Sequence, residues 1–146
     1  MKFHTDEVKC PGCELKLRYV HPYLVDWFHR VKANYPSVHI SDGWRGVVEQ
    51  EIAVKEGKSN LHYPNSKHNY TINGNACSLA LDIFQIDMDG TARWSFKFFE
   101  LIAKLNAEDC EPILWGGTFT VGKGGRDSPH FELILSKLPN DTRKVA

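Results

Sequence analysis

The sequence predicts an α+β fold in which helices pack on a mainly antiparallel sheet. Two observations predict it: apolar residues recur at helical spacing in two segments, and short apolar segments of strand length lie between and after them. No internal repeat or low-complexity segment competes with this interpretation. With 146 residues the chain is long enough for one hydrophobic core and too short for two ordinary ones, so we expect a single domain over 1–146.

The first half of the chain is expected to form two helices around a short strand. The first helix lies within 21–36, with Pro22 near its start and Pro36 beyond its end, and packs by four apolar residues: Leu24, Val25, Phe28 and Val31. A strand is expected at 37–41, followed by a turn and by a second helix at 47–57 that ends at its glycine. Residues 58–75 are rich in Asn, Ser, Lys and Gly, so we expect a long surface loop there, and such loops often carry function.

The second half is expected to combine three strands with one amphipathic helix. A nearly continuous apolar strand at 79–86 leads through a tight turn into a helix at 91–107. That helix should pack by one side, formed by Trp94, Phe98, Leu101, Ile102 and Leu105. The remaining strands are expected at 112–116 and 130–135, with a glycine-rich loop at 122–127 between them.

The composition gives no sign of a broadly charged binding surface. The 18 Lys and Arg residues balance the 18 Asp and Glu residues, so neither nucleic acid nor an anionic membrane is an expected partner. The N-terminus lacks the apolar core of a secretory signal, and no apolar run reaches the length of a membrane span. We therefore expect a protein that is made in the cytoplasm without a signal peptide, as a monomer, with its four cysteines reduced.

One carboxylate stands in the middle of the apolar strand at 79–86. Asp82 is tolerated in such a place only when a charged or hydrogen-bonding partner meets it. An Arg or Lys would be sufficient as a structural partner, whereas a divalent metal would also recruit histidines. Two histidines have suitable settings: His68 lies in the preceding loop, and His130 begins the last strand.

These three side chains have the composition of a catalytic zinc site. Two imidazoles and one carboxylate, with a fourth position for water, are common zinc ligands in enzymes. A base is also needed to take a proton from the water. Asp127 precedes His130 by three residues and is the first candidate. Glu132 is the rival, because strand alternation points it in the same direction as His130.

Four blocks of the sequence match the motifs of a known family and stand in the same order. CPGCELKLRYVHPYLVDWFHRVK comes first and SDGWRGVVEQ second; SKH then leads into the strand LALD, and DSPH follows. In these blocks the chain resembles the zinc peptidases that act on bacterial cell-wall peptides. That family includes D-alanyl-D-alanine carboxypeptidases, VanX- and VanY-type enzymes and phage endolysin L-alanyl-D-glutamate peptidases. The resemblance covers most of the chain and implies the small α+β fold that these peptidases share with hedgehog signalling domains.

The resemblance also implies a role for each candidate residue. The implied zinc ligands are His68, Asp82 and His130. By the same resemblance Asp127 is the general base that activates water. Arg45 matches the family arginine that binds substrate or stabilises the developing oxyanion, a role that suits a fixed guanidinium. Ser66, two residues before the first ligand, could hydrogen-bond substrate.

The chain departs from the family pattern in two places. Asp82 follows His68 by fourteen positions, which is more than in many members. We interpret the extra segment at 70–76 as a loop inserted beside the mouth of the site, where it could alter which peptide enters without displacing the ligands. The second departure is Asp127 itself, because several members have a glutamate at this position.

Structural roles remain open for several of these residues. Arg45 could form an ion pair with Asp42 or Glu49 within its turn. Asp127 could hydrogen-bond the backbone of its own turn. Glu132 is expected to orient a metal ligand rather than to act as the base.

Other signals in the sequence are weaker. Cys10 and Cys13 could form half of a structural zinc site or a redox pair, and only the isolated Cys77 and Cys110 remain among the cysteines to complete such a site. The segment HFE matches the His-x-Glu of zinc deaminases, but no Pro-Cys-x-x-Cys follows it. DMDG begins like a calcium-binding loop without the later ligands, so we expect only a turn.

The function implied by the resemblance is that of a zinc metallopeptidase. It would hydrolyse peptidoglycan stem peptides, either as a D-Ala-D-Ala carboxypeptidase or as an L-Ala-D-Glu endopeptidase. Such an enzyme without a signal peptide is expected to be a phage or prophage endolysin that acts on the cell wall after release. Two alternatives stay open: a non-catalytic, zinc-containing binding module of the same fold, and a cytoplasmic D-Ala-D-Ala dipeptidase.

Overall fold

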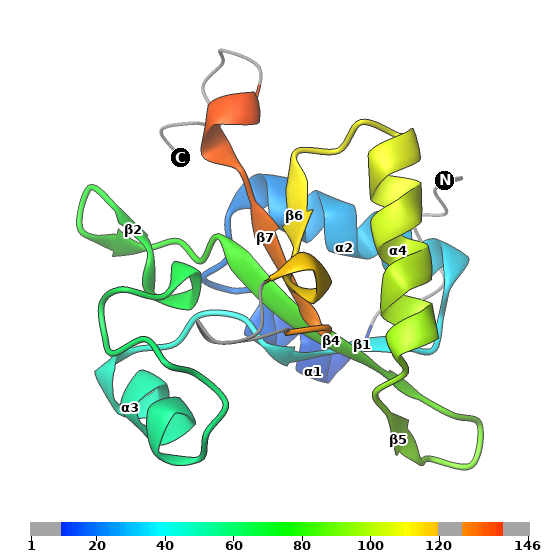
Figure 1. The fold of residues 1–146 in the computed structure, drawn as a ribbon, viewed down its shortest axis with the longest axis horizontal. Coiled ribbons are helices and arrows are strands. Elements are labelled where there is room, and N and C mark those ends of the chain that lie inside the picture. The colour runs from blue at the N-terminus through cyan, green and yellow to red at the C-terminus, as the bar shows by residue number, and fades with distance from the viewer. Residues whose placement is uncertain (1–9, 120–126, 139–146) are drawn as a thin grey trace.

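A five-stranded sheet forms the centre of the fold, and the computed structural model describes residues 10–119 and 127–138 around it (Figure 1). The strands follow the order β1-β4-β7-β6, with β5 paired to the end of β4, and each of these pairs is antiparallel. Their bounds are Val38–Asp42 for β1, Ala80–Ile86 for β4, Ala92–Arg93 for β5, Ile113–Trp115 for β6 and His130–Leu133 for β7. The predicted α+β class is confirmed, and four of the strands lie within two residues of their predicted positions.

Four α-helices pack around this sheet in the described part of the chain. They are α1 (Pro11–Lys16), α2 (Pro22–Asn34), α3 (Val47–Lys55) and α4 (Phe96–Glu108), and the 3₁₀ turns are η1 (Lys67–Asn69), η2 (Gly116–Thr118) and η3 (Leu135–Lys137). Helices α2 and α3 were predicted, whereas α1, a helix of six residues, was not. None of these helices, within the residues described, is long and apolar enough to cross a membrane.

The prediction for α4 was wrong at its start and in its packing side. The helix begins at Phe96, after Ser95, whose hydroxyl accepts a hydrogen bond from the backbone N–H of Phe98 at 3.3 Å. The residues before it pair with β4 as β5, so Trp94 stacks on Phe84 of β4 instead of joining the helix stripe. Leu101 is 40% exposed. The buried side of the helix consists of Phe98, Phe99, Ile102 and Asn106.

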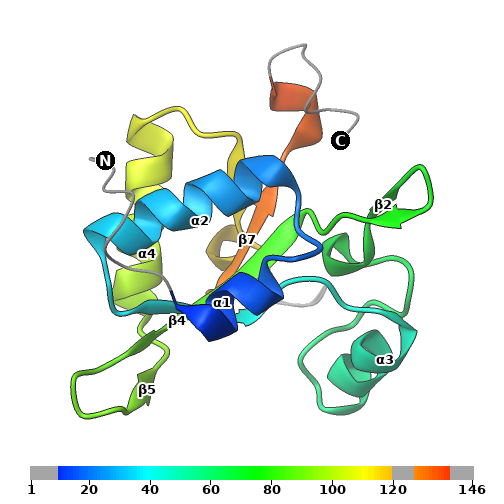
Figure 2. The ribbon, with the colours of Figure 1, turned by 180° about the vertical axis from the view of Figure 1, so that it is seen from behind.

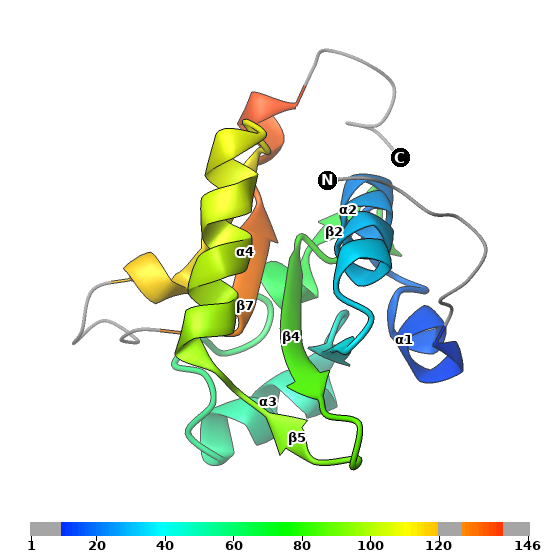
Figure 3. The same cartoon turned by 90° about the vertical axis from the view of Figure 1, so that its right-hand side faces the viewer.

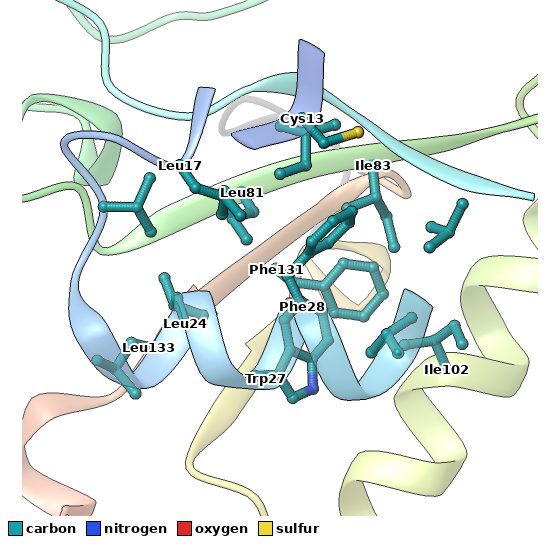
Figure 4. Packing of buried hydrophobic residues seen from close by; sticks show 14 of the residues in the cluster. Cys13, Leu17, Leu24, Trp27, Phe28, Leu81, Ile83, Ile102, Phe131 and Leu133 are labelled. Atoms are coloured by element: carbon teal, nitrogen blue, oxygen red, sulfur yellow. The ribbon is translucent and has the colours of Figure 1, made fainter. Parts of the chain in front are cut away.

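The hydrophobic core lies between the sheet, α2 and α4 (Figure 4). Trp27 of α2 is at its centre: its ring lies 5.5 Å from that of Phe131 in β7, and its indole N–H donates to Asn106 of α4 at 2.8 Å. The predicted stripe of α2 is buried except at Val25, which is only partly buried. Helix α3 stands apart from α2 and α4 (Figure 2), so it takes little part in this core.

The segment inserted between the two expected metal ligands forms a β-hairpin. Its strands are β2 (Thr71–Ile72) and β3 (Asn75–Ala76), joined by Asn73 and Gly74, which both have positive φ angles. Two such residues are typical of a type I′ turn. The hairpin projects from the body of the protein (Figures 1 and 2). The predicted loop at 58–75 therefore contains regular structure, and the predicted loop at 122–127 lies, except for its last residue, outside the described residues.

Close packing of α1 on the turn after β1 depends on Gly43. A Cβ atom at this position would lie 2.3 Å from the backbone oxygen of Lys16, which cannot move without displacing the helix. We expect Gly43→Ala to lower the free energy of unfolding by about 1–3 kcal/mol, as overpacking commonly does. Urea unfolding would measure it. The control is Gly12→Ala in α1, where the nearest atom lies at 4.0 Å; an equal loss in both variants would contradict this account.

Candidate metal centre

Strand alternation places two of the predicted ligands on the face of the sheet that is turned away from the core. Asp82 of β4 and His130 of β7 are register partners, and their neighbours Leu81 and Phe131 point into the core. Figure 3 shows β4 and β7 side by side in the middle of the fold. The turn η1 carries the third residue, His68, to the same place. All three side chains are buried.

The three side chains meet at one carboxylate oxygen. His68 Nε2 lies 3.2 Å and His130 Nδ1 lies 3.1 Å from Asp82 Oδ1, and the three ligand atoms all lie within 4.8 Å of one another. A tetrahedral zinc ion, with bonds of about 2.0–2.2 Å to nitrogen and oxygen, holds its ligand atoms about 3.3 Å apart. The observed donor set and its spacing therefore fit a zinc ion.

The outer nitrogen of each histidine has an acceptor that fixes the ring. His68 Nδ1 lies 2.7 Å from the backbone oxygen of Gly43, and His130 Nε2 lies 2.9 Å from Glu132 Oε1. These acceptors hold a proton on the outer nitrogens, so the inner nitrogens can present a lone pair to a metal. Glu132 contacts His130 in the way that its predicted orienting role requires.

Asp82 contacts both kinds of partner that the sequence left open for it: a cationic side chain and histidines that could share a metal. Besides the two histidines, it accepts a hydrogen bond on Oδ2 from Arg45 Nη2 at 3.1 Å. Burial alone would raise the pKa of Asp82, but the charge of His68 and the hydrogen bonds from His68 and His130 hold it well below its usual range. The carboxylate is therefore ionised and available as a ligand at any pH near neutrality.

Arg45 is fixed by a network that the sequence did not reveal. Its Nη2 also contacts Asp42 Oδ2 at 3.0 Å, as one structural alternative proposed, and its Nη1 donates to Gln50 at 3.3 Å. The amide of Asn69 donates to both Gln50 Oε1 and the Arg45 backbone oxygen. Gln50 in turn donates to the backbone oxygen of Leu61 at 2.6 Å, which ties α3 and the following loop to the site.

Asp127 lies beside the ligands and not among them. Its Oδ2 is 3.8 Å from His130 Nδ1, and its side chain is 38% exposed. Burial raises the pKa of Asp127, and the neighbouring charge of Asp82 raises it further. The close approach of Gly116 holds this turn: its backbone oxygen accepts from the Asp127 N–H at 3.0 Å, and a Cβ at Gly116 would lie 2.2 Å from the Asp127 oxygen.

A cleft of about 1090 Å³ opens over these residues. Its lining includes all the predicted site residues, among them Ser66, whose hydroxyl accepts from the His68 N–H at 3.1 Å. Two aromatic residues that the sequence did not assign to the site, Trp94 and Phe119, also line it. None of the residues at 70–76 does, so the inserted hairpin is not part of this lining.

The fold and the buried ligand set together define a class. The chain has the fold of the VanY-type zinc peptidases and a buried His-Asp-His group that could hold a metal ion, so the resemblance seen in the sequence is confirmed. Among solved structures, the chain is similar to the L-Ala D-Glu endopeptidase ChiX of Serratia marcescens. It matches with a TM-score of 0.64 and 26% sequence identity over 90% of this chain and 92% of ChiX. No protein-family model matches the chain, and no curated protein matches it.

Proposed function

We propose that this protein is a zinc metallopeptidase that hydrolyses peptidoglycan stem peptides. The observation that carries the proposal is the buried group of His68, Asp82 and His130 in a cleft, with the partly exposed carboxylate of Asp127 beside it. Of the two bond types considered, we favour the bond between L-Ala and D-Glu, because the similar solved structure is that of an L-Ala D-Glu endopeptidase.

His68 Nε2, Asp82 Oδ1 and His130 Nδ1 would hold the zinc ion. When bound, the ion supplies Lewis acidity that polarises a carbonyl and lowers the pKa of a water molecule. Asp127 Oδ2 takes a proton from the attacking water and later returns it to the leaving amine. Its raised pKa suits this exchange, because a carboxylate with a higher proton affinity is a stronger base.

Arg45 and Ser66 complete the site as positioning and binding groups. Arg45 fixes the second oxygen of Asp82, so that Oδ1 stays directed at the histidine nitrogens. Because the guanidinium also lines the cleft, we propose that it faces the negative charge that develops on the substrate carbonyl. Ser66 lies in the same lining, where its hydroxyl could bind the peptide backbone.

We further propose a biological setting for this activity. We propose that the activity belongs to a phage or prophage endolysin, which is made in the cytoplasm and reaches the wall after release. We propose that it works as a monomer with one domain over 1–146. Cleavage of free D-Ala-D-Ala but not of intact cell walls would favour a cytoplasmic dipeptidase instead.

Metal binding at this site should release a proton. Although burial lowers it, hydrogen bonds to Asp82 and Glu132 raise the pKa of His130 to about 10. The ring is therefore protonated at neutral pH before metal binds and must lose a proton to become a ligand. We expect release of about one proton at pH 7 and zinc affinity that rises with pH below about 10.

Calorimetry in buffers of different ionisation enthalpy measures this release. The titration of His68→Ala, subtracted from that of the wild type, isolates the contribution of this site. A difference titration that does not depend on the buffer would show that His130 is already neutral.

The cleaved bond can be identified by mass spectrometry of soluble fragments from purified peptidoglycan. We expect new N-terminal D-Glu residues in the wild-type digest and none with His68→Ala. New C-termini between the two D-Ala residues would instead indicate a carboxypeptidase. A zinc-loaded wild type that releases no fragments would favour the non-catalytic binding module.

A further inference from the structure

A second group of metal-ligating side chains lies between α1 and β1, outside the lining of the cleft. Cys10 is the N-cap of α1, Cys13 lies in its first turn, and His39 lies in β1 at the edge of the sheet. Figure 2 shows α1 beside this edge. Among the cysteines only the isolated Cys77 and Cys110 remained to complete a site with these two thiols, but the fold brings a histidine to them instead.

The distances in this group fit a shared central ion. Cys10 Sγ and Cys13 Sγ each lie 3.5 Å from His39 Nδ1, and the three atoms lie within 4.8 Å of one another. Zinc bonds of about 2.3 Å to sulfur and 2.0–2.1 Å to nitrogen, at a tetrahedral angle, place sulfur and nitrogen about 3.6 Å apart. A single ring nitrogen has one lone pair or one proton and so hydrogen-bonds well to only one thiol, yet both sulfurs lie equally close.

The chemistry of the donors selects the metal. Two thiolates and one imidazole favour Zn²⁺ over Mg²⁺ or Ca²⁺, which prefer oxygen ligands, and the two thiolates balance the charge of the ion. The backbone N–H of Cys13 lies 3.3 Å from Cys10 Sγ, where it would support a thiolate. Cys13 is buried and Cys10 only partly so, so the group is open to solvent on the Cys10 side.

We propose that Cys10, Cys13 and His39 bind a second, structural zinc ion that fastens α1 to β1. Its effect would reach the cleft through packing. The backbone oxygen of Lys16 in α1 closely approaches Gly43, and the Gly43 oxygen accepts from the outer nitrogen of His68. The second zinc ion thus braces, from outside the cleft, the turn that orients a ligand of the first.

Cobalt substitution of the purified full chain tests this proposal. Cobalt bound by thiolates gives a strong sulfur-to-metal charge-transfer band in the near ultraviolet, which a site of nitrogen and oxygen ligands lacks. We expect this band in the wild type and in His68→Ala. It should be absent from the double variant Cys10→Ser/Cys13→Ser and kept by the control Cys110→Ser, which changes an exposed cysteine outside the group.

Measurements of zinc content test the second site and the site in the cleft separately. Both Cys10→Ser/Cys13→Ser and His68→Ala should lose one zinc equivalent per chain, each from a different site. A wild type without the charge-transfer band, or a band that survives the double substitution, would overturn the second site.

Alkylation of the wild type gives a readout that does not depend on whether a variant folds. The partly exposed Cys10 should react with iodoacetamide only after chelation, whereas the exposed Cys110 should react at once. Equal protection with and without a chelator, or a Cys10–Cys13 disulfide in protein purified under reducing conditions, would also contradict the proposal.

Discussion

Asp82→Asn is expected to abolish zinc binding in the cleft and, with it, peptidase activity. Asp82 Oδ1 is the atom that both histidines approach, and Oδ2 pairs with Arg45, so one substitution removes a ligand and leaves a buried guanidinium with one carboxylate fewer. Loss of a residue that only orients a ligand costs about 10–100-fold in metal affinity, so loss of a ligand should cost more than about 100-fold. Equilibrium titration with zinc measures the effect.

Asp42→Asn is the matched control for this substitution. Asp42 is the other carboxylate that pairs with Arg45 Nη2, but it is 39% exposed and is not part of the ligand group. We expect this variant to bind zinc like the wild type and to lose little stability, because the Asp42 carboxylate is partly exposed and Arg45 keeps its ion pair with Asp82. Asp82→Asn with wild-type zinc affinity would show that the carboxylate only neutralises Arg45.

Asp127→Asn should leave zinc binding intact and lower kcat by about 10²–10⁴-fold, the usual contribution of a general acid–base group. Asparagine keeps the size of the side chain but cannot take a proton from water. The carboxylate lies 3.8 Å from His130 Nδ1, outside the three-residue ligand group, so the substitution should not disturb the metal. The measurements are zinc content and initial rates of amino-group release from peptidoglycan.

Glu132→Gln separates the two candidates for the base. Because Glu132 contacts the outer nitrogen of His130, this variant should bind zinc about 10–100-fold more weakly and regain activity when zinc is in excess. If Glu132→Gln remained inactive with zinc bound while Asp127→Asn kept its activity, Glu132 would be the base.

The site residues that could be predicted are those that do not fit the apolar pattern around them. A carboxylate in an apolar strand demands a partner, and the period of two in the last strand placed His130 and Glu132 on one side; the structure agrees with both inferences. Most strands were predictable because short apolar segments of strand length, bounded by turn residues, favour strands. The exceptions are β2, β3 and β5, which have two residues each and are too short to show a periodic pattern.

The remaining features depend on contacts between distant residues. Gln50 and Asn69 are polar residues without a periodic pattern, and their role follows only from the meeting of α3 with η1. His39 likewise faces Cys10 and Cys13 because α1 packs against β1, which no spacing in the sequence indicates. Leu101 was misplaced because helical spacing alone does not fix which side of an apolar helix faces the sheet.

Amino-group release from purified peptidoglycan, measured before chelation, after chelation and after zinc is restored, tests the central claim most directly. We predict activity in the zinc-loaded wild type, loss on chelation, recovery with zinc, and little activity in zinc-loaded Asp127→Asn. A zinc-loaded wild type that releases no more amino groups than Asp127→Asn, or activity that chelation leaves unchanged, would contradict the assignment as a zinc peptidase.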